Sequence, residues 1–362
     1  MPGFAEGAFL DVPSAEAGLE LSSAVSVLTN RRAQMKLVVQ IPCLNEEENL
    51  AATIADIPRQ IPGIDQVEIL VIDDGSADDT SGVARRAGAD RIVRFRRRQG
   101  LATAFKNGLD LALAMGADVI VNTDADNQYP GREIPRLIEP ILSGKADMVV
   151  GVRRIQEIRE FSRLKKFLQG LGSRFVQMIS STRIPDVTSG FRAYNRRAAL
   201  HLNVISLFTY TLETIIQAGK KNLAIASVTV ERHEKLRESR LFRSTPIYLK
   251  RSLATILRIF VTYEPFRVFF YLGTFIFSLG VLLGIRFLYF YFTLPAPTGH
   301  LQSLIFMTVL LFMGFLLLMI GLIADLISAN RRLIEDAVIR LKRIELQLDT
   351  RNKVSDGTES QV

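Results

Sequence analysis

Short apolar runs alternate with helical patterns over the first third of the chain, and this alternation constrains the fold more than any other feature. Apolar runs typical of buried strands lie at 37–41, 68–72, 91–95 and 119–123. Patterns typical of helices lie between them, at 79–87 and 101–115. Strands that alternate with helices predict an α/β fold, in which helices cover both faces of a mostly parallel sheet.

Polar residues follow the ends of three of these predicted strands. The clusters are Asn45-Glu46, Asp73-Asp74 and Asp124-Ala125-Asp126. In open parallel sheets, ligands bind beyond the carboxyl ends of the strands, so the three clusters together predict one binding site. Pro42 is expected to end the first strand, and the acidic residues at 46–48 are expected to begin a helix.

Two long uncharged stretches distinguish the last third of the chain, at 268–285 and 301–324. As a helix with 1.5 Å per residue, the second stretch spans about 36 Å, enough to cross a hydrocarbon core of about 30 Å. Arg and Lys residues flank the pair on both sides, and positive flanks remain in the cytoplasm. We therefore predict an integral membrane protein, in the inner or plasma membrane if the cell is bacterial. Its α/β domain and both termini are expected in the cytoplasm.

These patterns divide the chain into six segments. They are a mobile tail at 1–34, the α/β domain at 35–243, a juxtamembrane amphipathic helix at 244–265, a two-helix transmembrane hairpin at 266–329, an amphipathic or coiled-coil helix at 330–350 and a flexible tail at 351–362. Heptad-like spacing in the fifth segment fits either a coiled coil between copies of the chain or a helix at the membrane surface. Met35 directly precedes the first predicted strand, so a translation start there is a further hypothesis.

Composition excludes some sites and leaves several partners open. With one Cys a disulfide framework is impossible, and three scattered His residues do not form a His-rich metal site. The formal net charge of +8 fits nucleic acid, an anionic membrane or a phosphate-bearing substrate. No nucleic-acid-binding module accompanies the basic run at 94–98, so nucleic acid is not expected as a partner.

Asp124 and Asp126 have the spacing of a divalent-cation site. Two carboxylates at the end of a strand can hold Mg²⁺ or Mn²⁺ and leave positions open for phosphate oxygens. Such a pair by itself is also common in turns. A second acidic pair at a neighbouring strand end, Asp73 and Asp74, favours the functional interpretation.

Five segments together resemble the family 2 glycosyltransferases of the GT-A fold. They lie at 41–47 (IPCLNEE), 71–76 (VIDDGS), 123–128 (TDADNQ), 151–153 (GVR) and 186–192 (DVTSGFR). The last three are similar to motifs of the dolichyl- and undecaprenyl-phosphate sugar transferases within that family. The resemblance covers about residues 36–245 and extends to the hairpin, which some members of that branch carry.

The resemblance implies a role for each matching residue. Binding of the nucleotide-sugar donor is implied for Pro42, Asn45, Glu46, Asp73, Asp74, Asp124 and Gln128. The metal, Mg²⁺ or Mn²⁺, would be bound by Asp124 and Asp126. The acceptor phosphate would be bound by Arg153, Ser189 and Arg192, with Arg163 as a weaker candidate. Asp186 would act as a base or as an orienting carboxylate.

The function implied by this resemblance is metal-dependent, inverting transfer of one sugar from a UDP- or GDP-linked donor to polyprenyl phosphate at the cytosolic membrane face. One alternative is a membrane-bound enzyme that acts on a glycan or glycolipid acceptor in polysaccharide synthesis. A chain without Trp lacks the Q-x-x-R-W motif of such synthases. A catalytically inactive membrane scaffold is another alternative. The transmembrane and C-terminal helices are also candidates for joining copies into a homo-oligomer.

Overall fold

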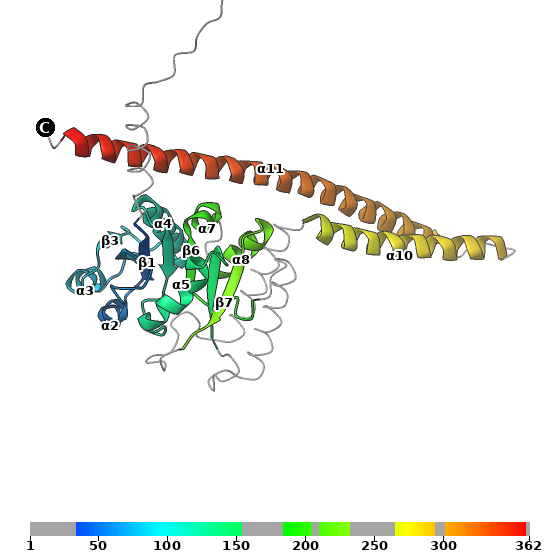
Figure 1. Cartoon of the computed structure of the whole chain (residues 1–362). Coiled ribbons are helices and arrows are strands. Elements are labelled where there is room, and N and C mark those ends of the chain that lie inside the picture. Colours follow the sequence, from blue (N-terminus) through cyan, green and yellow to red (C-terminus); the bar gives the residue numbers. More distant parts are fainter. Residues whose placement is uncertain (1–33, 154–183, 205–209, 232–264, 294–300, 360–362) are drawn as a thin grey trace, which may run out of the picture.

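The computed structural model describes residues 34–153, 184–204, 210–231, 265–293 and 301–359. The tail expected at 1–34 and the amphipathic helix expected at 244–265 lie almost entirely outside these residues, and so does Arg163. The described part of the chain forms an α/β domain and a pair of long helices that extends from it (Figure 1).

A seven-stranded sheet forms the centre of the domain. Its strands are β1 (Lys36–Cys43), β2 (Gln66–Asp73), β3 (Arg91–Arg94), β4 (Val119–Asn122), β5 (Met148–Val152), β6 (Arg192–Asn195) and β7 (Ile225–Thr229). Their order is β3-β2-β1-β4-β6-β5-β7, and β6 runs antiparallel to both of its neighbours. The other neighbouring pairs are parallel, which confirms the predicted sheet, and the four expected strands are β1 to β4.

Helices cover both faces of the sheet, as the alternating pattern predicts. One face packs against α4 (Leu101–Ala114), α7 (Arg196–His201) and α8 (Thr211–Lys220). The other face packs against α2 (Leu50–Asp56), α3 (Thr80–Arg86) and α5 (Ile134–Leu142), which follows the short 3₁₀ helix η1 (Gly131–Glu133). Successive residues of a strand point to opposite faces, so Val38 lies in the first core and Val39 in the second.

The segment after the first predicted strand differs from the prediction in two ways. β1 continues through Pro42 to Cys43, paired with β2. Pairing of β1 with β4 ends at Gln40, so the missing N–H of Pro42 leaves no gap in that ladder. The acidic residues at 46–48 do not begin the helix, because they lie in the turn that precedes α2, which starts at Leu50. The N–H groups of Glu46 and Glu47 donate to side chains after β2.

α10 (Pro265–Thr293) and α11 (Leu301–Glu359) pack against each other at glycines. Gly273 lies against the backbone of Gly314, and a Cβ atom on Gly314 would lie only 2.7 Å from the backbone nitrogen of Phe277. Small residues allow such close approach in pairs of membrane-spanning helices. Away from this contact the pair exposes large apolar side chains, including Phe275 at 68% and Phe292 at 79%. By length and composition, both helices are able to cross a membrane.

Beyond its contact with α10, α11 continues and lies across the domain beside α4 and α7 (Figure 1). Lys342 of α11 forms a 2.6 Å ion pair with Asp110 of α4, and Glu335 pairs with Lys221 at 3.4 Å. Ile339 is buried in the same contact. The contact fixes the direction in which the two long helices leave the domain.

Candidate functional site

The polar clusters predicted from the sequence meet at one edge of the sheet. β1, β2, β4 and β5 run in the same direction, so their carboxyl ends lie together, and the antiparallel β6 begins at that edge. The predicted residues that this edge carries are Pro42, Asn45, Glu46, Asp73, Asp74, Asp124, Asp126, Gln128, Arg153, Asp186 and Ser189. The topology therefore assembles segments that are far apart in the chain into one candidate site.

The loops after β1 and β2 are linked to each other through Asn45. Its backbone N–H donates to Oγ of Ser76 at 3.0 Å, and its side-chain oxygen accepts from the N–H of Ala77 at 2.8 Å. Asn45 has a φ of 55°, in the left-handed region that Asn tolerates better than most residues. A single residue thus turns the chain out of β1 and joins it to the loop after β2.

Asp73 and Asp74 are buried, and both accept hydrogen bonds from backbone N–H groups, Asp73 within its own loop and Asp74 from the loop before α4. Asp73 accepts from the N–H of Ser76 at 2.8 Å, and its second oxygen accepts from the hydroxyl of Ser81. Asp74 accepts from the N–H groups of Gln99 at 2.6 Å and Gly100 at 2.9 Å, directly before α4. These carboxylates therefore shape the rim of the site, and their predicted contact with a nucleotide remains a prediction.

Asp124 and Asp126 follow β4 and lie close enough to repel each other. Burial and the Asp126 carboxylate raise the pKa of Asp124 to about 7, against the opposing positive charges of Arg153 and Arg192. Gln128 donates from its backbone to Asp126 at 3.3 Å and from its side-chain amide to the other carboxylate oxygen. The three side chains form one oxygen-rich group with an unfavourable concentration of negative charge.

This pair of carboxylates fits a divalent cation bound together with a phosphorylated ligand. A cation between them would relieve the repulsion that raises the pKa of Asp124. No group of three or more His, Cys, Asp or Glu residues suited to a metal occurs in the described ranges. Mg²⁺ at nucleotide sites commonly uses one or two carboxylates and completes its shell with water and phosphate oxygens, so two are enough.

Gly190 and Asn122 are site residues that the sequence interpretation missed. A Cβ atom on Gly190 would lie within 3.0 Å of both oxygens of Asp124 and of the Tyr210 hydroxyl. Asn122 donates to the carbonyl oxygen of Gly190 at 2.8 Å and to the Tyr210 hydroxyl at 2.9 Å, and it accepts from Gln40 at 2.9 Å. The polar Asn122 in an otherwise apolar strand was the available signal.

Arg153 and Asp186 form a two-point ion pair next to this group. Nε of Arg153 donates to Oδ2 of Asp186 at 2.6 Å, and Nη2 donates to Oδ1 at 3.0 Å. Thr188 accepts from Nη2 at 2.8 Å and donates to Asp186 at 2.9 Å. Burial alone would raise the pKa of Asp186, but the hydrogen bonds and charge of Arg153 outweigh burial and lower it. A carboxylate held in this way is a weak base.

Arg192 does not reach the surface of the site. It is completely buried, and it donates to the carbonyl oxygens of Ser189 at 2.7 Å, Val187 at 2.8 Å and Thr211 at 2.8 Å. A further bond goes to Oγ1 of Thr214 at 2.7 Å. The expected direct contact between Arg192 and an acceptor phosphate is therefore wrong for this structure. The guanidinium donates to carbonyl oxygens of the protein and in this way holds the 187–190 loop in position.

Ser189 is also buried, within 3.4 Å of the hydroxyl of Tyr129. Tyr129 stacks on Phe191 with ring centroids 5.0 Å apart, and burial raises its pKa to about 12. Tyr129 is therefore neutral, and its buried ring packs in the core near Asp124. The structure leaves Arg153 as the most accessible of the three described residues predicted to bind phosphate.

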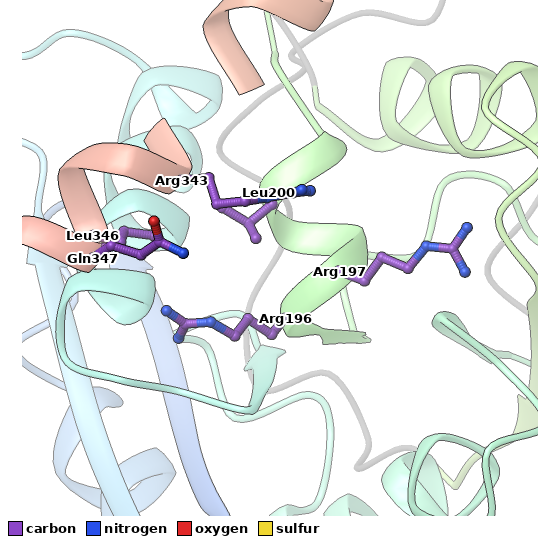
Figure 2. Close-up of a pocket in the computed structure, with 6 residues that line it drawn as sticks. All are labelled: Arg196, Arg197, Leu200, Arg343, Leu346 and Gln347. Carbon is purple, nitrogen blue, oxygen red and sulfur yellow. The ribbon is translucent and has the colours of Figure 1, made fainter. Parts of the chain in front are cut away.

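A cavity of about 590 Å³ lies elsewhere, between α7 and α11 (Figure 2). Its lining residues are Arg196, Arg197, Leu200, Arg343, Leu346 and Gln347. Arg196 directly follows the end of β6, so this cavity is at the opposite edge of the sheet from Asp124. The guanidinium groups of Arg196 and Arg197 point in different directions in Figure 2, so they do not converge on one ligand.

Comparison with known proteins supports a family assignment. The family described as "Glycosyl transferase family 2" matches residues 38–202. The polyprenol monophosphomannose synthase of Mycolicibacterium smegmatis is 34% identical over 46% of this chain and 64% of its own length. The undecaprenyl-phosphate mannosyltransferase of Micrococcus luteus is 30% identical over 57% of this chain and 88% of its own. The crystal structure of a mycobacterial protein, 21% identical, aligns with a TM-score of 0.51 over 64% of this chain and 75% of that one, which supports the fold alone.

Proposed function

Because the chain belongs to glycosyltransferase family 2, we propose that it transfers a single sugar from a nucleotide-sugar donor to polyprenyl phosphate, with inversion at the anomeric carbon. The observation that carries this proposal is the position of Asp124. Its buried carboxylate lies close enough to Asp126 and Arg153 for the first to raise its pKa and the second to lower it. A group suited to a metal-bound diphosphate and a cation suited to a second phosphate thus lie side by side. The names of the Mycolicibacterium and Micrococcus relatives support mannose as the sugar and a polyprenyl phosphate as the acceptor.

The donor is proposed to lie along the carboxyl edge of the sheet. Pro42, Asn45, Glu46, Asp73 and Asp74 surround the nucleotide, and Asp124 with Gln128 faces the diphosphate. Asp124 and Asp126 would hold Mg²⁺ or Mn²⁺, which would supply positive charge to the leaving nucleoside diphosphate. The donor is expected to be a UDP- or GDP-linked sugar, and an assay with both kinds identifies its base.

In the proposed reaction, an oxygen of the lipid phosphate attacks the anomeric carbon, and the bond from that carbon to the nucleoside diphosphate breaks. The attacking oxygen is already anionic near neutral pH, so no strong base is required. Asp186 suits this chemistry, because its lowered pKa makes it a poor base but a firm partner for Arg153. We assign Asp186 to orientation of Arg153.

Arg153 is proposed to bind the acceptor phosphate. Asp186 and Thr188 accept from Nε and Nη2, so Nη1 is the guanidinium nitrogen that we propose donates to the acceptor phosphate. A hydrogen bond from a charged guanidinium to a phosphate oxygen is strong and directional, so the held orientation of Arg153 would determine where the acceptor oxygen lies. Ser189 and Arg192 contribute by shaping the adjoining loop.

The acceptor lipid also requires a membrane location. α10 and α11 are proposed to cross the bilayer as a hairpin, with the domain and both termini on the cytosolic side. The exposed apolar surface of the two helices supports insertion, and the Arg and Lys residues on both flanks support this orientation.

The test is an assay of the purified full-length protein with polyprenyl phosphate, Mg²⁺ or Mn²⁺ and a panel of UDP- and GDP-linked sugars. One donor is expected to yield a lipid-linked monosaccharide, and Asp124→Ala and Asp126→Ala are each expected to abolish it. Glu139→Ala, an exposed acidic residue of α5, is the matched control and is expected to retain activity. A growing glycan product would favour the polysaccharide-synthesis alternative. Absence of product with every donor would favour the inactive scaffold.

A further inference from the structure

α11 carries a stripe of exposed aliphatic side chains with alternating spacings of three and four residues. The stripe consists of Ile320, Ile323, Ile327, Asn330, Ile334, Ala337, Leu341, Ile344 and Leu348. Its seven large members are 45–65% exposed. This spacing is the a/d pattern of a coiled coil, in which apolar residues recur every 3.5 residues on one side of a helix.

The stripe lies on a side of α11 that is exposed beside its contacts with α10 and the domain in the described part of the chain. α10 packs against Gly314 and Leu318 of α11, and the domain packs against Glu335, Ile339 and Lys342. At about 100° of rotation per residue, Gly314, Leu318 and Ile339 lie on the opposite side of the helix from the stripe, and Glu335 and Lys342 lie on its flank, one position after Ile334 and Leu341. A second helix is therefore able to lie along the stripe without meeting either α10 or the α/β domain.

The membrane accounts for only the first part of this exposure. Ile320 and Ile323 lie in the uncharged stretch, where lipid covers apolar side chains, but that stretch ends at Ala324, and Asp325, Arg331 and Arg332 follow it. Beyond them α11 continues as the same helix along the domain, away from the hairpin (Figure 1). Ile334, Leu341, Ile344 and Leu348 therefore face water in a single copy of the chain.

The charges beside the stripe match a second copy of the same helix. With Ile334 and Leu341 at a positions, Arg340 occupies a g position and Glu345 the following e position. In parallel coiled coils these two positions of neighbouring helices form ion pairs. Copies inserted in one membrane with the same orientation are necessarily parallel, so Arg340 faces Glu345 of the partner subunit, and the reverse pair forms by symmetry.

We propose that α11 joins copies of this chain into a parallel homo-oligomer through the stripe from Ile320 to Leu348. The inference rests on the proposed membrane insertion but is independent of the proposed reaction. Asn330, the polar member of the stripe, restricts the helices to one register, because a shifted partner would bury its amide against Ile side chains. The α/β domains then lie on the outside of the paired helices, each held to its own α11 by the Lys342–Asp110 pair.

Disulfide cross-linking in membranes tests this contact on the full-length protein. Leu341→Cys is expected to give a cross-linked dimer under mild oxidation. Asp336→Cys, an exposed residue on another face of the same helix, is the matched control and is expected to remain uncross-linked. Native Cys43 is buried and does not interfere. Failure of Leu341→Cys to cross-link, or equal cross-linking of both variants, would overturn the proposal.

A charge exchange then tests the pairing without depending on a new thiol. Light scattering of the solubilised protein is expected to give the mass of two or more copies. Arg340→Glu and Glu345→Arg are each expected to lower the ratio of oligomer to monomer at least tenfold, and the double variant is expected to restore the wild-type ratio. A monomer at all concentrations would show that lipid or another segment covers the stripe, and an oligomer insensitive to both changes would place the contact elsewhere. Either result contradicts the inference.

Discussion

Gly190 leaves room for the carboxylate of Asp124, since a Cβ atom at position 190 would lie 2.8 Å from Oδ1 and 2.9 Å from Oδ2 of that residue. The carbonyl of Gly190 is held by Asn122 at 2.8 Å, so the backbone cannot move away without losing this bond. The glycine thus sets the position of a carboxylate that we propose binds the metal.

Gly190→Ala is therefore expected to weaken Mn²⁺ binding and sugar transfer by about 10–100-fold, the range typical of changes directly behind a metal ligand. Electron paramagnetic resonance of Mn²⁺ titrations measures the binding. Gly151→Ala is the matched control, because its Cβ atom would meet Phe191 at 2.8 Å and not a carboxylate. Equal losses of Mn²⁺ affinity in both variants would mean that overpacking, and not displacement of Asp124, causes the effect.

Asp186→Asn distinguishes two roles of Asp186, as a carboxylate that orients Arg153 or as a general base. Because the carboxyl is expected to act through Arg153, the variant should retain activity, raise the KM for polyprenyl phosphate about tenfold and keep the acidic limb of the pH–rate profile. Thr188→Val, which leaves the Arg153–Asp186 contacts in place, should have a smaller effect on that KM. A loss of about 10²–10⁴ in kcat together with disappearance of the acidic limb would instead identify Asp186 as a base.

Arg153→Ala is expected to destabilise the domain in a pH-dependent way. At pH 7 it leaves the buried Asp186 charge unpaired, which costs about 3–5 kcal/mol in the free energy of unfolding. The folded-state pKa of Asp186 is lowered from 3.8, so the pair stabilises the fold above this value and loses its contribution as the pH falls through the lowered one. Urea unfolding at pH 7 and pH 3 should show a smaller difference between variant and wild type at pH 3. Arg132→Ala, which breaks the exposed Arg132–Glu231 pair, should change stability little at either pH.

Metal binding is expected to strengthen as the pH rises through 7. The raised pKa of Asp124, about 7, means that a proton competes with the cation below this value. Mn²⁺ affinity at pH 6 should be about tenfold lower than at pH 8. Chelation of divalent cations should abolish transfer, and added Mn²⁺ or Mg²⁺ should restore it. A pH-independent affinity, or full activity in the presence of chelator, would contradict the assigned role of Asp124.

Cys43 is expected to resist alkylation in the folded protein. Burial, followed by the negative charge of Asp73, raises the pKa of this thiol well above its ordinary range, and its Sγ lies 3.5 Å from the carbonyl oxygen of Ile72. Iodoacetamide should label it only on unfolding, while activity remains unchanged, and mass spectrometry follows the label. Since the chain has one Cys, this reaction also reports unfolding of the sheet. Rapid labelling of the active protein would show that β1 opens in the native state.

Local patterns in the sequence determined the first four strands of the sheet, the edge at which its polar clusters lie and the two long apolar helices. Val38 and Val39 belong to a short apolar run of the kind that forms a buried strand, and Asp124 follows another such run. Such features depend on neighbours in the chain, so they are visible without the fold. The family motifs extended this to specific residues, including the pair Asp124 and Asp126.

Tertiary structure alone decided which of these residues are available to a ligand. Arg192 and Arg153 both lie in glycosyltransferase motifs, yet one is enclosed by carbonyls from α8 and the 187–190 loop, and the other is held beside Asp124 by Asp186. Only the structure likewise shows that Gly190 must lack a side chain, because it lies against the carboxylate of Asp124, which is far from it in the chain. Burial and hydrogen bonding between distant segments follow from how the strands are ordered, and no local spacing of residue types encodes that order.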